Sequence, residues 1–517
     1  MSERAERLAG ATLAVLASLA VVYVAWKLRD DHVGDATIYL AYAENAGEGR
    51  PFQFNEGEFS SGSTSPLWSL ILGVPYAFGG GIGAAKVLAA LFAVGAVLAV
   101  FHAAREISGS WLAAGAATLF VPGAMTFYPV SLYESGLIVA LSALSLVAMS
   151  RVYACWRDEG ELALRTALPL VAIWAALPLS RPDAVLLVAA EAVALLAFAP
   201  VPRGAALRAL VPLAALATLP SVAYFGYSIA ATGTASTSSD ARSYALQEVA
   251  REFVGPLYRN ADALREVVGS PWIFSLLPAL AGLLLLARRA DARWLAAHGA
   301  LSIAGYLFLL TFVAPGFYDS PRYLLPVVPI VVCAVAYLLA RASGGALRAA
   351  ALAAAVLVIG LATADRLNDD LDLIAGFGID EREVFSKEPV AVVNRMARPG
   401  DVLLSYEVQL RLFLRDDVKV LSQDGIIDGE VREYQESRDM TGFLREQRPD
   451  WWIADQNVNT RPYLRGSVLE RVFDAFKADP TLRSRSYEGI RFELVKRRRR
   501  PLQPGFGGWQ MLFRVSY

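Results

Sequence analysis

The feature that most constrains this chain is a series of long apolar segments separated by short charged connections. A helix needs about 20 largely apolar residues to cross the hydrocarbon core of a bilayer. By that criterion the sequence predicts eleven membrane-spanning helices, at 8–26, 82–103, 111–129, 133–154, 165–180, 183–200, 208–230, 271–287, 293–314, 322–341 and 346–364. The 517 residues are 55% hydrophobic and 19% charged, which is more apolar than a typical soluble protein. We therefore expect a polytopic α-helical membrane protein.

The charged connections predict the orientation of these helices. Lys and Arg concentrate in short cytoplasmic loops. The apolar segment 67–78 is too short to cross comfortably, so we interpret it as re-entrant or interfacial. If it does not cross and the N-terminus is inside, every even-numbered connection is basic and faces the cytoplasm. The first span, 8–26, is then a retained signal anchor, and the C-terminus lies outside.

A second domain is predicted after Ala364, where charged residues crowd in and long apolar runs stop. Short apolar, β-rich segments recur at 402–404, 418–421, 451–454, 492–495 and 511–513, with helical patterns at 388–397, 440–447 and 464–478 between them. This alternation indicates a small α/β domain. The predicted organisation is a transmembrane domain at 1–364, with large external loops at 27–81 and 232–270, followed by a soluble extracytoplasmic α/β domain at 365–517.

Composition argues against several classes of function. The net charge of −1 gives the chain no overall positive potential that would attract nucleic acid. Cys155 and Cys333 fall in or beside apolar spans, and the three histidines are scattered without the spacing of metal ligands. We therefore predict no cofactor and do not favour a divalent metal, although Asp35, Glu134 and Asp183 would offer hard oxygen ligands if they clustered.

The connection after the first span is long and acidic and ends in a cluster of Gly, Ser, Thr and Pro. Long ordered loops are usually functional. Residues 36–46 are predicted to form a short amphipathic helix on the membrane surface, with Asp35 at its N-cap. Asp35 has two interpretations at this point: a capping residue, or a carboxylate held at the bilayer edge for chemistry.

A resemblance favours the second interpretation. The stretch GDATIYLAYAENAGEGRPFQFNEGEFSSGSTSPLW, residues 34–68, resembles the first external loop of GT-C glycosyltransferases. The shared pattern is an acidic residue followed by YxxYAxN, G-x-PFxFN-x-GE and G-x-TSPLW, although Gly34 and Asp35 stand where the family form has two adjacent acids. The segment DSPRYLLPVVP resembles the family's RYLxPxxP helix start, and LSRPDAVLL its RPDG/RPEG segment. The resemblance implies a GT-C fold and a polyprenyl-phosphate sugar as donor.

Site residues follow from this chemistry. A phosphate leaving group is already anionic, whereas the acceptor hydroxyl needs a base, so one carboxylate suffices and Asp35 is our candidate general base. Arg322 and Arg181 are candidates for binding the donor phosphate. Arg322 has lipid-headgroup snorkelling as its alternative, and Arg181 a structural part in a capped turn. Further substrate-binding candidates are Asp31, Tyr39, Glu134, Asp183, Asp240, Arg242, Asp319 and Tyr323.

The predicted function is an inverting glycosyltransferase of the plasma membrane, similar to mannosyltransferases and terminal arabinofuranosyltransferases. It would transfer a monosaccharide from a polyprenyl-phosphate donor to a hydroxyl of a cell-envelope glycan, glycolipid or protein at the outer face. Two alternatives stay open. One is a transporter or flippase of lipid-linked sugars, although transporters place ionisable residues near the bilayer midplane. The other is a non-catalytic envelope scaffold.

Overall fold

The structure is a computed structural model that describes residues 2–29, 36–125, 132–236, 272–309, 320–341, 345–376, 379–427, 429–455, 464–503 and 506–517. The chain divides into two compact units. The helical unit comprises Met1–Val33, Gly80–Ala223 and Gly255–Gly376, and the mixed unit comprises Gly34–Gly79, Tyr224–Val254 and Phe377–Tyr517. The domain boundary expected at 364/365 falls inside one long helix, α18 (Gly345–Gly376).

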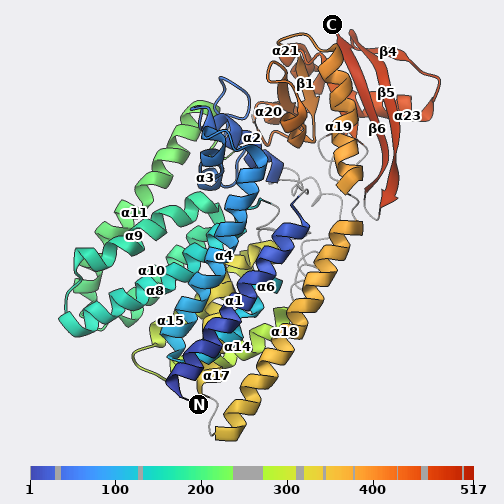
Figure 1. The fold of residues 1–517 in the computed structure, drawn as a ribbon. Helices are drawn as coiled ribbons and strands as arrows, with labels where there is room; N and C mark the ends of the chain where they lie inside the picture. Colours follow the sequence, from blue (N-terminus) through green and yellow to red (C-terminus); the bar gives the residue numbers. More distant parts are fainter. Residues whose placement is uncertain are drawn as a thin grey trace. The chain divides into compact units, whose positions relative to one another are not determined.

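The helical unit holds the membrane helices (Figure 1). Its α-helices are α1 (Glu3–Lys27), α4 (Gly81–Ser108), α5 (Trp111–Thr118), α6 (Phe120–Met125), α8 (Ser135–Glu159), α9 (Leu164–Ser180), α10 (Val185–Phe198), α11 (Arg203–Thr232, whose last turns group with the mixed unit), α14 (Trp272–Ala287), α15 (Arg293–Phe308), α16 (Ser320–Tyr323), α17 (Val328–Arg341) and α18. Within the described residues, four of these are long and apolar enough to cross a membrane: α1, α4, α8 and α11. Shorter apolar helices cover parts of the other predicted spans. The structure thus has the expected multi-helix membrane architecture, and the count of eleven spans stays a prediction.

Two predicted spans are interrupted rather than continuous. The span expected at 111–129 is divided into α5 and α6 around Leu119, and its last residues lie outside the described part of the chain. The span expected at 322–341 is divided into α16, a 3-10 turn at Leu325–Val327 and α17. Pro326 lies in that turn, where a missing N–H and a fixed φ favour the start of a helix over its interior.

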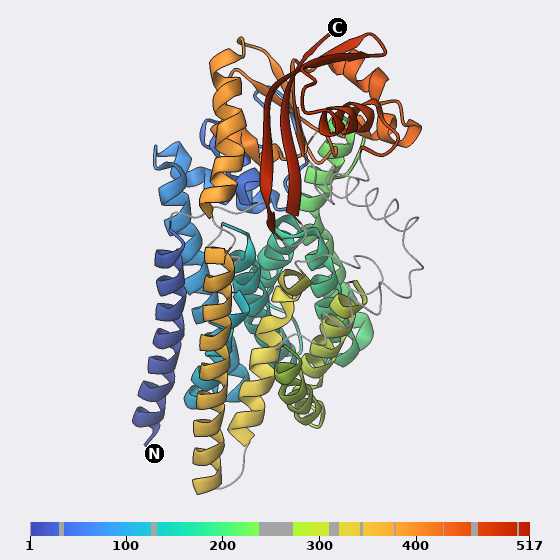
Figure 2. The ribbon, with the colours of Figure 1, turned by 90° about the vertical axis from the view of Figure 1, so that its right-hand side faces the viewer.

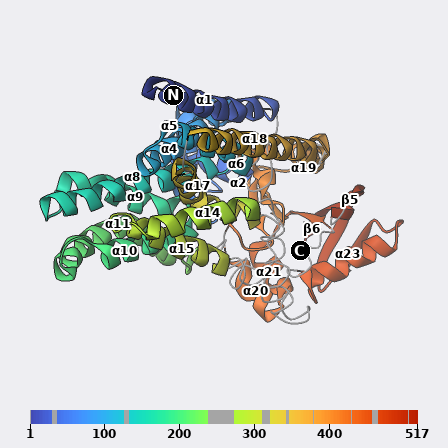
Figure 3. The same ribbon diagram turned by 90° about the horizontal axis from the view of Figure 1, so that it is seen from below.

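Small residues let several helices of this unit approach closely. A Cβ added at Gly282 of α14 would lie 2.1 Å from the carbonyl oxygen of Ala334 in α17. A Cβ at Gly10 of α1 would lie 2.1 Å from the Trp111 carbonyl oxygen at the start of α5, and Figure 3 shows α5 beside α1. Such contacts are typical of membrane helices, which associate through close packing of their backbones.

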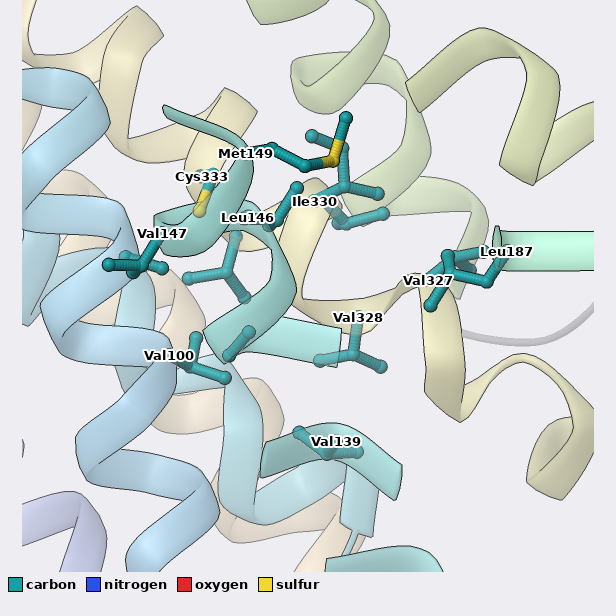
Figure 4. Close-up of a cluster of buried hydrophobic side chains, with 14 of the residues drawn as sticks. Val100, Val139, Leu146, Val147, Met149, Leu187, Val327, Val328, Ile330 and Cys333 are labelled. Atoms are coloured by element: carbon teal, nitrogen blue, oxygen red, sulfur yellow. The ribbon is translucent and has the colours of Figure 1, made fainter. Parts of the chain in front are cut away.

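The interior of the helical unit is filled by aliphatic side chains from several helices. Figure 4 shows Val100 of α4, Leu146 of α8 and Ile330 of α17 in one buried cluster. Many large apolar side chains are also exposed on the outside of the bundle, including Leu8, Leu16, Leu19, Val87, Leu91, Leu216, Leu219, Leu284, Leu357 and Leu361. Helices that are apolar on both faces are typical of a membrane-embedded bundle.

The mixed unit is built on a six-stranded sheet with the order β2-β1-β3-β6-β5-β4. The strands are β1 (Val402–Ser405), β2 (Lys419–Ser422), β3 (Trp451–Asp455), β4 (Ser484–Tyr487), β5 (Ile490–Gln503) and β6 (Phe506–Ser516). Strands β2, β1 and β3 are parallel, and the other pairs are antiparallel; Figure 2 shows β5 and β6 side by side as long arrows. All five residues of β3 are buried, as expected of a central strand covered on both faces.

The helices of the C-terminal part are α19 (Ile379–Met396), α20 (Val431–Ser437), α21 (Met440–Gln447) and α23 (Val468–Ala478). Every β-rich segment predicted in this region lies within or overlaps a strand, and the three helical patterns overlap α19, α21 and α23. The mixed sheet confirms the expected α/β character of the C-terminal region. Strand β4 was not predicted, because its sequence, SRSY, has no apolar run.

The first loop also belongs to the mixed unit. Helix α2 (Ala36–Gly47) confirms the helix predicted at 36–46, but its placement as an amphipathic helix on the membrane surface is wrong, because nine of its twelve residues are buried. It packs closely on α3 (Pro66–Ala77): a Cβ added at Gly73 would lie 2.9 Å from Cβ of Ala46.

Candidate active site

The described residues include about half of the predicted site. Asp35, the candidate base, lies outside the described residues, as do Asp31, Asp240, Arg242 and Asp319. Arg181, Arg322, Glu134, Asp183 and Tyr323 all lie in the helical unit, and Tyr39 lies in the mixed unit.

Arg181 joins two carboxylates that are distant from each other in sequence. It follows α9 in an extended conformation, and Pro182 begins a 3-10 turn directly after it. Its Nε and Nη2 donate to the two carboxylate oxygens of Asp183 at 3.0 and 3.3 Å, and its Nη1 donates to Oε1 of Glu134 at 3.1 Å. Arg181 and Glu134 are almost fully buried. Two carboxylates therefore compensate the charge of Arg181, which suits a positioning role; its assignment to the donor phosphate stays a prediction.

Glu134 reaches this arrangement from the start of α8. It occupies the N-cap position of that helix but makes no side-chain capping bond, and its carboxylate turns to Arg181 instead. Its second oxygen, Oε2, is buried and has no hydrogen-bond partner among the described residues. The sequence predicted that Glu134 would contribute to the site, and its pairing with Arg181 brings two of the candidates together.

Arg322 lies against aromatic rings. Its Cζ is 4.9 Å from the ring centroid of Tyr133 and 5.5 Å from that of Tyr323, and its side chain is 4% exposed. The ring of Tyr323 also lies 4.7 Å from Cζ of Arg181. A guanidinium over a tyrosine face is attracted by the ring quadrupole. The two arginines, two carboxylates and two tyrosines thus form one cluster, which we call the arginine–tyrosine cluster (Tyr133, Glu134, Arg181, Asp183, Arg322 and Tyr323).

Tyr306 of α15 contacts the cluster by donating from its hydroxyl to the backbone carbonyl of Asp183 at 3.2 Å. Neither Tyr306 nor Tyr133 was predicted as a site residue. Tyr133 had a usable signal, because it directly precedes Glu134 in a polar turn between two apolar spans. Tyr306 had no such sequence signal, because a tyrosine inside an apolar span is usually a buried core residue.

A second polar group inside the helical unit was also missed. Glu191 of α10 is fully buried and accepts from Oγ of Ser145 and Nε1 of Trp174, each at 2.5 Å. A lone acid in the apolar stretch VLLVAAEAVALLAF was the available signal, since ionisable residues inside membrane segments are rare and commonly functional.

Tyr39 lies in α2 and is 2% exposed, and its hydroxyl is 2.6 Å from Oγ1 of Thr64. This places it in the interior of the mixed unit. Within the described residues, no group of three or more His, Cys, Asp and Glu side chains is arranged to hold a metal ion. Glu134 and Asp183, considered as oxygen ligands, both point to Arg181.

No protein-family model matches the chain, and no curated protein matches it. Two solved structures of ArnT from Cupriavidus metallidurans do match over almost their whole length. The apo structure matches with a TM-score of 0.58 at 14% sequence identity, and the match covers 97% of this chain and 98% of the ArnT chain. The structure bound to undecaprenyl phosphate has a TM-score of 0.52 at 15% identity and covers 97% of each chain. At this identity the matches show the fold alone: a multi-helix membrane protein with a C-terminal mixed sheet, similar to ArnT.

Proposed function

We propose that this chain is an integral membrane glycosyltransferase of the GT-C type. It transfers a monosaccharide from a polyprenyl-phosphate donor to a hydroxyl of a cell-envelope glycan, glycolipid or protein, with inversion at the anomeric carbon. The observation that carries the proposal is the full-length fold similarity to ArnT, one structure of which is bound to undecaprenyl phosphate. The motifs around Asp35, Arg181 and Arg322 support the same class.

The proposed step divides the work between a base and a cation. The Asp35 carboxylate takes the proton of the acceptor hydroxyl as the acceptor oxygen attacks the anomeric carbon. The bond between that carbon and the phosphate oxygen breaks, and the electron pair leaves on the polyprenyl phosphate. Arg322 compensates the phosphate charge by charge-assisted hydrogen bonds. No strong general acid is needed, because the leaving phosphate is stable as an anion.

The contacts of the two arginines support different roles for them. Arg181 is held by the carboxylates of Glu134 and Asp183, and both of these ion pairs lie within the cluster. Arg322 stacks on the faces of Tyr133 and Tyr323, which orient its guanidinium. We therefore assign the donor phosphate to Arg322 and a supporting role to Arg181.

The test uses the full-length protein in lipid nanodiscs with a panel of synthetic polyprenyl-phosphate hexoses and pentoses and an envelope extract as acceptor. Wild-type protein should consume one of these donors and release polyprenyl phosphate. Asp35→Asn should lower the rate about 10²–10⁴-fold, the usual contribution of a general base, whereas the matched change Asp30→Asn should alter it little.

Three results would contradict the proposal. An Asp35→Asn protein with the wild-type rate would remove the catalytic assignment. Movement of the intact donor across the membrane without release of phosphate would indicate a transporter. A wild-type protein that neither consumes nor moves any donor of the panel would favour a scaffold.

A further inference from the structure

Strand β2 forms one of the two edges of the mixed sheet, and a side chain from the first loop pairs with this edge. Asn55 bonds to both backbone groups of Val420 in β2. Nδ2 of Asn55 donates to the Val420 carbonyl at 2.8 Å, and the Val420 N–H donates to Oδ1 of Asn55 at 3.0 Å. Asn55 is 6% exposed. Its amide thus satisfies the edge groups much as a neighbouring strand would.

Contacts on both sides of Asn55 extend this attachment. Nζ of Lys419 lies 2.6 Å from Oε1 of Glu58. The Ser60 hydroxyl donates to the backbone carbonyl of Ile427, after the end of β2. A Cβ added at Gly62 would lie 2.5 Å from the Ile426 carbonyl oxygen, so this position accepts only glycine without a shift. We call these contacts, together with the Asn55 pair, the edge latch.

The same loop residues also hold α2. The hydroxyl of Tyr42 is hydrogen-bonded to Oγ of Ser60. Nδ2 of Asn45 donates to the backbone carbonyls of Gln53 and Phe54 at 3.0 and 3.1 Å. A continuous set of hydrogen bonds therefore runs from the sheet edge through residues 53–60 to α2, and α2 begins at the residue directly after Asp35.

We propose, building on the transferase activity proposed above, that the C-terminal domain positions the catalytic loop and that Asn55 is a positioning residue for the reaction. Asn55 and Glu58 belong to the motif PFQFNEGE, which carried the family resemblance. Their contacts explain why the motif contains an asparagine and a glutamate at these positions. The amide of Asn55 forms hydrogen bonds with both backbone groups of Val420, and the carboxylate of Glu58 forms an ion pair with Lys419. A base attached to a loosely held helix would lose the near-attack geometry on which its effect depends.

The first test is Asn55→Ala, compared with Asn394→Ala as a matched control. Asn394 makes the same kind of paired bonds, donating to the Phe413 carbonyl at 2.8 Å and accepting from the Arg415 N–H at 3.0 Å, but neither partner belongs to the first loop or to β2. Hydrogen exchange of the full chain should become about tenfold faster at residues 36–47 and 419–422 in Asn55→Ala, because two buried bonds are lost. Phe413 ends a 3-10 turn, Val408–Phe413, that packs on α2. Asn394→Ala acts on α2 only through this packing, so it should speed exchange at residues 36–47 much less than Asn55→Ala does.

Steady-state kinetics then separate positioning from simple stability. In Asn55→Ala, kcat should fall about 100-fold with the donor KM changed far less, because binding at Arg322 is retained while the base is misplaced. Unchanged exchange at residues 36–47 would overturn the proposal, and so would faster exchange with a wild-type kcat. The exchange result does not depend on turnover, so a failure of the proposed function is distinguishable from a failure of the edge latch.

Reversing the charges of the Glu58–Lys419 pair gives a second test that stays informative if Asn55→Ala fails to fold. Glu58→Lys places like charges together and should lower kcat about two- to fivefold, in line with the modest energy of half-exposed pairs. Adding Lys419→Glu restores the pair with reversed polarity and should restore kcat. A double variant that is no more active than Glu58→Lys would contradict the role of this contact.

Discussion

Arg181 donates from Nη1 to Oε1 of Glu134 over 3.1 Å, and the two side chains are 4% and 3% exposed. Taking two charges out of water costs several kcal/mol, which their attraction offsets only when both partners are present. The pair links the turn before α8 to the turn after α9, 47 residues later. It therefore fixes the relative position of the polypeptide segments that carry most of the arginine–tyrosine cluster.

Removing Glu134 tests this link. Glu134→Ala should destabilise the protein by about 1–3 kcal/mol, because Arg181 loses one buried charge-assisted hydrogen bond while Asp183 still compensates its charge. Thermal unfolding of the full chain in detergent measures the change. Glu159→Ala, an exposed acid at the other end of α8, is the matched control and should have little effect. Equal unfolding temperatures for the two variants would mean that the pair does not hold these segments together.

Arg322 should determine the affinity for the lipid phosphate. Arg322→Lys keeps the positive charge but loses the planar fork and the stacking on Tyr133 and Tyr323. We expect the Kd for undecaprenyl phosphate to rise about tenfold or more, measured by titration in nanodiscs. Arg165→Lys, at an exposed position of α9, serves as control and should bind as the wild type does. Unchanged affinity in Arg322→Lys would direct the search for the phosphate site elsewhere.

The fold could be predicted from the sequence wherever the signal is local. Twenty apolar residues indicate a membrane helix, and runs such as Trp451–Ala454 indicate a buried strand, because burial of each segment follows from its own composition. The burial of α2 could not be predicted this way. Its neighbouring loop is held by Val420, 365 residues after Asn55, and no pattern within residues 36–47 reveals that partner.

The candidate site shows the same division. Arg181 and Arg322 were recognisable because each lies in a polar turn beside proline at the edge of an apolar span. The contacts of these residues could not be predicted from the sequence. The Arg181–Glu134 pair and the Tyr306–Asp183 hydrogen bond depend on how helices distant in the sequence pack against each other. Only the structure distinguishes the surroundings of the two arginines: Arg181 is bound by two carboxylates, whereas Arg322 stacks on two tyrosine rings.

Two glycines of the helical unit should respond in opposite ways to the same change. At Gly282 an added Cβ would meet the Ala334 backbone, so Gly282→Ala should separate α14 from α17 and destabilise the protein by about 1–3 kcal/mol. At Gly95 of α4 an added Cβ has nothing within 4 Å, so Gly95→Ala should be neutral or stabilise by up to about 1 kcal/mol through helix propensity. Thermal unfolding of the two variants side by side measures this difference. Similar shifts in both would show that α14 and α17 do not pack through Gly282.

The C-terminal part of the mixed unit should lose a small stabilising contribution at acidic pH through Glu488. The Thr441 hydroxyl donates to Glu488 at 2.7 Å and Arg471 forms an ion pair with it, and both lower the pKa of this carboxyl below its ordinary value of 4.5. A carboxyl whose pKa is lowered on folding stabilises the folded state above its unfolded pKa, and this contribution is lost as the pH falls through the folded pKa.

Glu488→Gln removes the charge and should therefore speed hydrogen exchange at residues 440–447 relative to wild type at pH 7. The difference should shrink as the pH is lowered through the folded pKa, which lies below 4.5, because the wild-type carboxyl is then itself protonated. The effect should be modest because the pair is about half exposed, and a difference between the two proteins that is independent of pH would show that Glu488 acts through its shape rather than its charge.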